Sequence, residues 1–374
     1  MKRAASCWPQ DITFESGPPN VLTTKHLHEI YAESEHERVV FWTDDRVGYR
    51  GIIAVHSTLL GPAVGGVRFW DYGCEKLASL DALRLSRAMT YKNALAGLPF
   101  GGGKSVIIGD NKVREGREQI LRAHGRFVDS LGGSYIAAED VGTTPEDVRC
   151  MGLETRHVAG LPHLSGDPSP MTAYGVLRAV QASAQYRWGS DRLAGRRVAI
   201  QGCGKVGYHL AGLLKRAGAG LIVSDVDAER AARVAAELGA AVVAPEEIFD
   251  AEADIFAPCA LGGVVNDESI PRLKVEIVAG SANNQLQEAR HGDALAASGI
   301  LYAPDYVANS GGVISGCSIE LLGWEPAQVS KKVHAIYETL LSIFRLADAE
   351  GLSPARAADR LAEQKLKSAS NPSG

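Results

Sequence analysis

A short glycine-rich segment in the second half of the chain most strongly limits the fold. The segment VAIQGCGKVG lies between an apolar run that favours a strand and a stretch that favours a helix. In this context the first glycine allows a tight turn, and the second lets the backbone approach a pyrophosphate. The third permits close packing of the helix, whose N-terminus attracts the anion. The pattern predicts a dinucleotide-binding loop made by Gly202, Gly204, Lys205, Val206 and Gly207.

Apolar runs that favour strands alternate with helical patterns through the same half of the chain. The candidate strands are 196–201, 220–225, 240–244, 253–259, 276–280 and 300–307. Helical spacing at 207–218 and 227–239 separates the first of them. This alternation is typical of a doubly wound parallel sheet, the Rossmann type of α/β fold.

Asp225 stands at the end of the strand that follows the glycine-rich loop. In dinucleotide-binding sheets a carboxylate at this place bonds the ribose hydroxyls, and it would repel a 2′-phosphate. The sequence therefore predicts NAD as the cofactor rather than NADP.

The length of the chain and the pattern of its first half predict more than one domain. At 374 residues the chain exceeds the roughly 250–300 at which a single core usually stops growing. Strand and helix patterns mix in the first half, at 38–44, 49–60, 77–97, 104–110, 117–133 and 134–140. We expect an N-terminal α/β domain over 1–168 and the Rossmann domain over 169–325. A helical segment over 326–374, with a long helix at 331–351, is expected to pack back on the N-terminal domain.

Charge and cysteine content exclude several classes of partner. The net charge of −5 gives no basic footprint for nucleic acid or an anionic membrane. No run of about 18 apolar residues offers a membrane span, and the N-terminus lacks the apolar run of a signal peptide. The six cysteines are scattered without a CxxC pair. We therefore expect a cytoplasmic protein with no metal site.

Two lysines occur among small and apolar residues in the segment TYKNALAGLPFGGGKSVIIGD. Lys92 lies near the end of a predicted helix, and Lys104 follows three glycines where a strand is predicted to begin. Lysines usually keep their ammonium group in water, with the stem on the surface. Here the glycines leave room for a substrate beside the ammonium of Lys104.

Asp140 lies in a strand-to-helix corner, ahead of Thr144, which is predicted to cap the next helix with Pro145 at its first position. Such corners bind ligands in α/β sheets. The chemistry that fits is hydride removal from a carbon that bears an amine and a carboxylate. One lysine would pair with the carboxylate, and the other, its pKa lowered by burial, would polarise a water that attacks an imine. Asp140 would then move protons.

The motifs MTYKNALAGLPFGGGKSVI, AEDVGTT, PSPMTAYGV, DIFAPCALGG, GSANNQL and YAPDYVANSGGVI resemble the Glu/Leu/Phe/Val dehydrogenase family, and most closely its leucine, valine and phenylalanine branch. The resemblance covers about residues 30 to 365. It implies an NAD-dependent L-amino acid oxidative deaminase whose active site lies in the cleft between a substrate domain and a Rossmann domain. It also implies a homo-oligomer.

The same resemblance implies individual roles. Lys92 matches the lysine that binds the substrate carboxylate, Lys104 the catalytic lysine, and Asp140 the proton-transfer aspartate. The residues that match positions beside the substrate backbone, the nicotinamide or the substrate amine are Gly65, Gly66, Thr172, Cys259, Ala260, Asn283 and Asn284. Which of the two asparagines contacts a ligand stays open.

The expected side-chain pocket is apolar. The glutamate branch carries a lysine where this chain has Val64, and a serine near Gly316, so a distal carboxylate would be buried unpaired, which is costly. We expect Val64, Ala138, Val313 and Gly316 to line the pocket, which favours leucine, valine or isoleucine. Gly316 replaces the valine that is usual in the leucine type, so phenylalanine and even tryptophan remain alternatives. A non-catalytic NAD-binding or assembly protein is the alternative of a different class.

Overall fold

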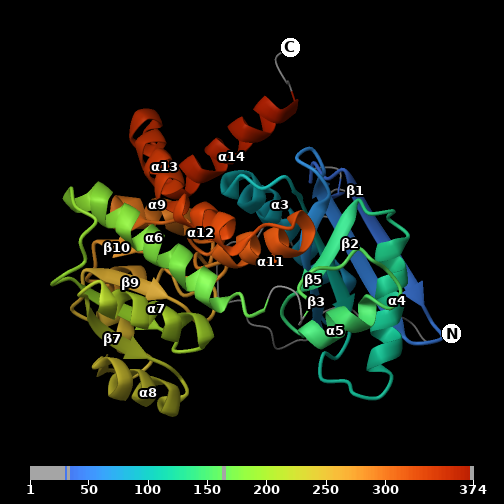
Figure 1. Cartoon of the computed structure of the whole chain (residues 1–374), viewed down its shortest axis with the longest axis horizontal. Coiled ribbons are helices and arrows are strands. Elements are labelled where there is room, and N and C mark those ends of the chain that lie inside the picture. The colour runs from blue at the N-terminus through green and yellow to red at the C-terminus, as the bar shows by residue number, and fades with distance from the viewer. Residues whose placement is uncertain (1–29, 32–33, 162–165, 371–374) are drawn as a thin grey trace. The chain divides into compact units, whose positions relative to one another are not determined.

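The computed structural model describes residues 30–31, 34–161 and 166–370. The chain divides into two compact units, which are described separately below (Figure 1). The first holds the residues up to 93 together with 99–162, and the second holds 94–98 together with 163–374.

The first unit is built on a mixed five-stranded sheet with the order β1-β2-β4-β3-β5. Its strands are β1 (Arg38–Asp44), β2 (Tyr49–Ser57), β3 (Ala63–Trp70), β4 (Gly101–Ile108) and β5 (Tyr135–Glu139). Strand β2 pairs antiparallel with β1 and β4, whereas β3 pairs parallel with β4 and β5. The parallel part brings the ends of β3, β4 and β5 to one edge of the sheet.

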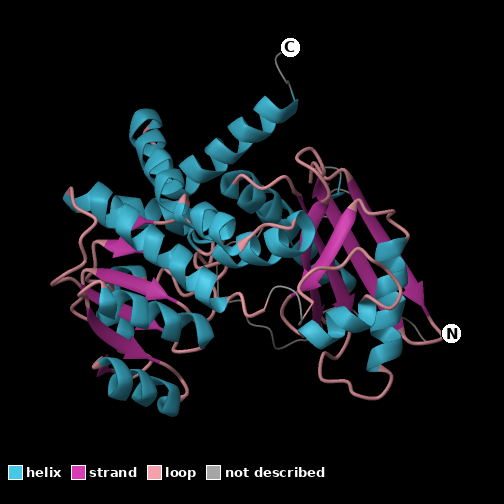
Figure 2. Ribbon diagram, in the orientation of Figure 1, coloured by secondary structure: helices cyan, strands magenta, loops and turns pink. Residues whose placement is uncertain are grey.

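Helices cover both faces of this sheet (Figure 2). Alternate residues of a strand point to opposite faces, so Ile52 and Ile53 belong to different cores. Ile52 packs with the apolar side of α3 (Glu75–Ala96). Ile53 packs with α4 (Arg117–Asp129) and α5 (Pro145–Met151). The predicted cap of α5 is confirmed, because Thr144 and Asp147 form a capping box.

The glycines of β4 allow close approach on both faces of the strand. A Cβ on Gly102 would lie 2.0 Å from the backbone nitrogen of Thr90 in α3. A Cβ on Gly103 would lie 2.6 Å from the ring of Tyr135. The sequence predicted that this strand begins at Lys104, but β4 already begins at Gly101, because the glycines take part in the sheet.

The second unit contains an all-parallel six-stranded sheet with the order β11-β10-β9-β6-β7-β8. Its strands are β6 (Arg197–Gln201), β7 (Gly220–Ser224), β8 (Ala241–Val242), β9 (Ile255–Pro258), β10 (Ile277–Val278) and β11 (Leu301–Tyr302). The order reverses beside β6, which is typical of a doubly wound sheet. The predicted α/β fold with a Rossmann-type sheet is confirmed.

Helices surround the parallel sheet. They are α6 (Ser169–Trp188), α7 (Lys205–Arg216), α8 (Ala228–Leu238), α9 (Arg290–Ala297), α10 (Asp305–Ala308), α11 (Gly311–Leu322), α12 (Pro326–His334), α13 (Ile336–Glu350) and α14 (Pro354–Ser370), with short 3₁₀ turns at Ile248–Asp250 and Ile270–Arg272. Helix α6 packs against α7, α11 and α13, and α9 and α14 pack beside β11. Within the residues described, no helix has both the length and the apolar character needed to cross a membrane.

Two further predicted elements differ from the structure. The expected strand at 300–307 ends at Tyr302, since Pro304 has no N–H for the ladder and α10 begins at Asp305. The expected helix at 331–351 is two helices, α12 and α13, which meet at Ala335. Helix α14 lies in the segment 326–374 that was expected to be helical, although its own bounds were not predicted.

Candidate active site

One face of the first unit's sheet gathers the side chains that the sequence singled out. Gly66 pairs with Ala138 across β3 and β5, and Lys104 of β4 lies on the same side. Asp140 directly follows β5, two residues after Ala138, and therefore returns to this face. The sheet alone thus brings Lys104 and Asp140 together.

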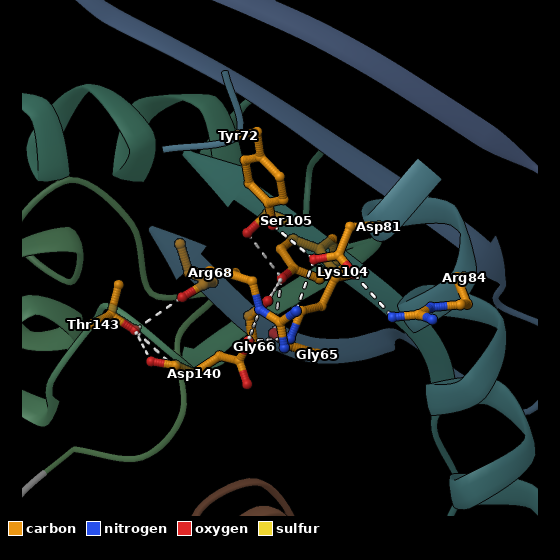
Figure 3. Close-up of polar contacts among 12 residues, drawn as sticks. Gly65, Gly66, Arg68, Tyr72, Asp81, Arg84, Lys104, Ser105, Asp140 and Thr143 are labelled. Atoms are coloured by element: carbon orange, nitrogen blue, oxygen red, sulfur yellow. Dashed lines mark hydrogen bonds and ion pairs between the residues drawn. The ribbon is translucent and has the colours of Figure 1, made fainter. Parts of the chain in front are cut away.

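Lys104 and Asp140 form a buried ion pair (Figure 3). The Lys104 Nζ lies 2.8 Å from Asp140 Oδ2, and the two side chains are 5% and 18% exposed. Burial lowers the pKa of the Lys104 ammonium, and the neighbouring Arg68 guanidinium lowers it further, against the opposing effect of Asp140. Burial alone would raise the pKa of Asp140, but Lys104 and Arg68 hold it below its ordinary value. The pair therefore joins a lysine whose pKa is lowered to a carboxylate that stays ionised.

The glycine pair of β3 makes room for this ion pair. A Cβ on Gly66 would lie 2.6 Å from the Cβ of Asp140 and 3.2 Å from Lys104 Nζ. The first distance is shorter than real Cβ atoms show, and the second is tighter than most, so a side chain at position 66 would displace Asp140 and crowd Lys104. The sequence analysis placed Gly65 and Gly66 beside a substrate, and the structure places Gly66 beside the predicted catalytic groups.

Arg68 extends the pair into a chain of alternating charges. Its Nε donates to Asp140 Oδ2 at 2.9 Å, and its Nη1 donates to Asp81 Oδ2 at 2.7 Å. Asp81, on α3, also accepts the Tyr72 hydroxyl at 2.7 Å. The sequence analysis missed Arg68, Asp81 and Tyr72. A signal was present for Arg68, which follows Gly66 by two residues and therefore shares its face of the strand.

The corner after β5 holds Asp140 from its backbone side. The Asp140 N–H donates to Thr143 Oγ1 at 2.9 Å. The Thr143 hydroxyl in turn lies 2.9 Å from the carbonyl oxygens of Val67 and Asp140. These hydrogen bonds hold the turn against β3 and so fix the backbone position from which the Asp140 side chain extends.

Lys92 and Val64 lie on two elements that border the same face of the sheet. Lys92 is half-buried on α3, the helix that covers this face. Val64 is buried on β3, two residues before Gly66. Their assigned roles stay predictions.

A buried polar network supports β4 from its other face. Ser105 Oγ is hydrogen-bonded to His124 Nε2 at 3.0 Å, and His124 Nδ1 is hydrogen-bonded to the Tyr49 hydroxyl at 2.6 Å. The Tyr135 hydroxyl donates to the carbonyl oxygen of Gly65 at 2.8 Å. Complete burial lowers the pKa of His124 to about 3, so the imidazole is neutral at physiological pH. The network therefore adds no charge behind Lys104.

In the second unit the glycine-rich segment forms a tight loop between β6 and α7. Gly202 has a φ of 100°, a conformation that favours glycine. A Cβ on Gly207 would lie 1.9 Å from the carbonyl oxygen of Gly202, so the third glycine permits the close approach predicted for it. Gly204 precedes the first residue of α7, and a Cβ there would meet no atom within 4 Å among the described residues.

The N-terminus of α7 suits an anion. No side chain caps this end, and its first turn holds no acidic residue. The first N–H groups of a helix without a cap can bind a phosphate, and the helix dipole favours negative charge there. Lys205 and Val206 open the helix, and Lys205 is exposed. The loop therefore fits the pyrophosphate of a dinucleotide.

Asp225 directly follows β7 and is bound to the loop. Its Oδ2 accepts the N–H of Cys203 at 2.6 Å, and its Oδ1 accepts the N–H of Asp227 at 2.8 Å. An ionised carboxylate accepts further hydrogen bonds at its remaining lone pairs. The side chain is thus fixed beside the predicted pyrophosphate site, as a ribose-binding carboxylate would be.

Cys259 and Ala260 follow β9 and border the same loop. The Cys259 N–H donates to Gln201 at 2.7 Å, and a Cβ on Gly202 would lie 2.9 Å from the Ala260 Cβ. Burial raises the pKa of the Cys259 thiol, which argues against a thiolate nucleophile. Thr172 lies on α6, and a Cβ on Gly312 of α11 would approach its hydroxyl to 2.6 Å.

One member of the Asn283–Asn284 pair is hydrogen-bonded to a third asparagine. Asn309 Nδ2 donates to Asn283 Oδ1 at 2.6 Å, and Asn309 is buried. Asn284 has a φ of 52°, an uncommon conformation that asparagine tolerates better than most residues. The sequence analysis missed Asn309, although it lies within the motif YAPDYVANSGGVI.

The last two predicted pocket residues share one helix. Val313 and Gly316 are both half-buried on α11, three residues apart and so on neighbouring positions of its surface. A Cβ added at Gly316 would meet none of the described atoms within 4 Å. Across the described ranges, no three His, Cys, Asp or Glu side chains are grouped to hold a metal ion.

Comparisons with known proteins give one consistent result. Residues 36–157 match the model of the Glu/Leu/Phe/Val dehydrogenase dimerisation domain, and 165–231 and 223–374 match that of the glutamate/leucine/phenylalanine/valine dehydrogenases. Leucine dehydrogenase of Thermoactinomyces intermedius is 51% identical, over 89% of this chain and 91% of that protein. Phenylalanine dehydrogenase of Caldalkalibacillus thermarum is 46% identical, over 89% and 92%. The crystal structure of L-tryptophan dehydrogenase from Nostoc punctiforme has a TM-score of 0.82 at 44% identity, covering 92% of this chain and all of that one.

Proposed function

Because the chain belongs to the Glu/Leu/Phe/Val dehydrogenase family, we propose that it oxidises an apolar L-amino acid with NAD and water to the 2-oxo acid, ammonia and NADH. The observation that carries this proposal is the buried ion pair of Lys104 and Asp140. A lysine with a lowered pKa beside an ionised carboxylate can activate water and move protons, which hydrolysis of an imine requires.

The residues of the chain have distinct tasks in this mechanism. Lys92 binds the substrate carboxylate, and NAD, when bound, accepts the hydride from the α-carbon. Water then adds to the resulting imine. Lys104 polarises that water and stabilises the oxygen of the carbinolamine, while Asp140 takes a proton from the water and returns it to the leaving amine. Gly66 leaves the space in which these groups meet the substrate.

The substrate side chain that we assign is leucine, valine or isoleucine. Val64, Ala138 and Val313 are apolar, and no cation stands at position 64 for a distal carboxylate. Phenylalanine is the second candidate, because Gly316 leaves open space where a larger residue would fill it. A methylene changes selectivity in an apolar pocket by only ~1–3 kcal/mol, so activity on several of these substrates is expected.

The two sheets support a proposal for the cofactor and for the role of each domain. We assign NAD to the loop at 202–207, with Asp225 on the ribose and Thr172, Cys259, Ala260 and the Asn283–Asn284 pair toward the nicotinamide or the substrate amine. Residues 1–168 would bind the substrate, 169–325 would bind the cofactor, and 326–374 would form the C-terminal helical segment.

We further propose a cytoplasmic homo-oligomer. The family model that matches residues 36–157 is described as a dimerisation domain, which supports self-association. Cys74, Cys150, Cys203, Cys259 and Cys317 are unpaired, as is usual in a reducing compartment.

The test measures initial rates of NADH formation with leucine, valine, isoleucine, phenylalanine, tryptophan and glutamate. We expect rates with the aliphatic substrates to be highest and the rate with glutamate to be negligible. The alternative result is that none of these amino acids yields NADH although the protein still binds NADH, which shows that the dinucleotide loop is intact. That result would support a non-catalytic nucleotide-binding protein.

A further inference from the structure

We propose that Arg68 is a positioning residue that clamps one oxygen of the Asp140 carboxylate, Oδ2, and so leaves the other, Oδ1, as the atom that transfers protons. This inference rests on the proposed function, because it concerns the proton-transfer step of the same site.

The two cations beside Asp140 converge on a single oxygen. Lys104 Nζ lies 2.8 Å from Oδ2, and Arg68 Nε donates to the same Oδ2 at 2.9 Å (Figure 3). Oδ1 takes part in neither bond. A carboxylate whose one oxygen accepts two charge-assisted hydrogen bonds cannot rotate without breaking both. The second oxygen therefore keeps a fixed direction.

Arg68 is itself held in place. Its Nη1 donates to Asp81 Oδ2 at 2.7 Å, and the Tyr72 hydroxyl donates to the same oxygen at 2.7 Å. The Arg68 and Asp81 side chains are only 19% and 14% exposed. A planar guanidinium can bond two carboxylates at once through different nitrogens, which the single ammonium of a lysine does less well. Arginine is thus suited to link α3 to the corner that carries Asp140.

The arrangement also sets the charge balance around Asp140. The charged groups that act on it are Lys104 from β4 and Arg68 from β3, and Asp81 from α3 acts on both cations. Burial is the main cause that raises the pKa of Tyr72 and of Tyr135, and the charge of Asp140 adds a smaller effect in the same direction. Two cations and two carboxylates leave the cluster near neutral, so the ionised form of Asp140 persists although it is largely buried.

The proton step is then localised on one atom. An O–H bond of the water breaks and an O–H bond forms on Oδ1, while the oxygen electron pair joins the imine carbon and the C=N π pair moves to nitrogen. The proton on Oδ1 later passes to the leaving amine. Oδ2 stays bonded to Lys104 and Arg68 throughout.

The test replaces Arg68 and follows the pH profile of kcat. In Arg68→Met the carboxylate loses one clamp and one cation, so we expect kcat to fall by about 10²-fold, as for a misplacement of catalytic groups by about 1 Å. The acid limb of the profile should move to higher pH, because the pKa of Asp140 rises without the guanidinium. The NADH dissociation constant should stay within about twofold, since its loop lies in the other unit.

A matched control removes the other arginine that contacts Asp81. Arg84 Nη2 lies 3.5 Å from Asp81 Oδ1, and the Arg84 side chain is 65% exposed. Arg84→Met should keep the kcat and acid limb of the unchanged enzyme. Arg68→Lys, which keeps the charge but not the fork, should leave the acid limb in place with kcat reduced about tenfold.

Several outcomes would overturn the inference. They are an unchanged kcat or an unmoved acid limb in Arg68→Met, and an equal shift in Arg84→Met. If Arg68→Met does not fold, the Arg68→Lys variant provides the test. A full kcat in Arg68→Lys would show that a guanidinium bonded to two carboxylates is not needed. An enzyme inactive on every amino acid would refute the proposed function itself. An active enzyme that is silenced by Lys104→Met but indifferent to Arg68→Met would refute only the role of Arg68.

Discussion

Gly65 of β3 and Gly103 of β4 approach so closely that a Cβ on Gly65 would lie 1.7 Å from the carbonyl oxygen of Gly103. The obstacle is backbone, which cannot rotate away as a side chain can. The two strands therefore hold Lys104 and the glycine pair at a spacing that only glycine permits.

The first prediction concerns this contact. Gly65→Ala should destabilise the first unit by at least ~3 kcal/mol, the upper range for overpacking, because β3 and β4 must separate. Gly316→Ala is the matched control, since the added methyl group meets open space. Thermal unfolding of both variants checks this, and an equally stable Gly65→Ala would contradict the close packing of the strands.

The second prediction concerns the ion pair. Lys104→Met and Asp140→Asn should each lower kcat by about 10²–10⁴-fold, the usual contribution of acid–base catalysis. NADH binding, measured by fluorescence titration, should change little. Lys112→Met, at an exposed lysine of the same unit, serves as the control and should be fully active. Near-normal turnover in Lys104→Met would rule out the assigned role.

The third prediction concerns stability against acid. Burial lowers the pKa of His124 from an ordinary 6.5 to about 3. As the pH falls, His124 therefore becomes protonated in the unfolded state before it does so in the folded state. The stabilising contribution of neutral His124 is complete above pH 6.5 and is lost as the pH falls toward 3. The slope is about 1.4 kcal/mol per pH unit for each such proton. His124→Asn should therefore show a shallower loss of stability in denaturant titrations between pH 6.5 and 4, and parallel curves for both proteins would disprove it.

The fourth prediction concerns the substrate side chain. Gly316→Val should lower kcat/KM for phenylalanine and tryptophan relative to leucine, by about 10–100-fold, because the new side chain occupies open space. Competition assays with paired substrates measure this ratio directly. A ratio that does not move would place Gly316 outside the pocket.

The fifth prediction concerns the choice of cofactor. Asp225→Asn should weaken NADH binding and narrow the gap to NADPH, because the repulsion of a 2′-phosphate is lost. Asp227→Asn is the neighbouring control. Asp227 caps α8 through the N–H groups of Glu229 and Arg230, so its loss should affect stability without altering the ratio of the two cofactors. Tighter binding of NADPH than NADH by the unchanged protein would refute the role of Asp225.

The sequence was most informative where local pattern and chemistry coincide. The glycine-rich loop, the carboxylate after β7 and the capped corner at Thr144 each occupy a few consecutive residues, and each was predicted in place. Lys104 and Asp140 were predicted individually. Their contact at 2.8 Å depends on β3 lying between β4 and β5, which periodicity cannot reveal.

The missed residues share a different cause. Arg68, Tyr72 and Asp81 lie on a strand, the loop after it and a helix, and each would pass for a surface polar residue when viewed alone. Their role can be recognised only in the folded protein, where α3 covers the sheet and the Asp81 carboxylate accepts a hydrogen bond from the Arg68 guanidinium. The predicted length of the strand at 300–307 was wrong for a local reason. An apolar run alone does not distinguish a short strand from the helix that follows Pro304.

The alternating charges of Asp81, Arg68, Asp140 and Lys104 all belong to the first unit. One hydrogen-bonded frame thus holds the proposed acid–base groups, whereas the proposed pocket residues Val313 and Gly316 and the proposed dinucleotide loop belong to the second unit. Point changes at Val313, Gly316 or the loop can therefore alter the proposed substrate or nucleotide preference of a descendant protein, while the four charged side chains of the first unit are inherited unaltered.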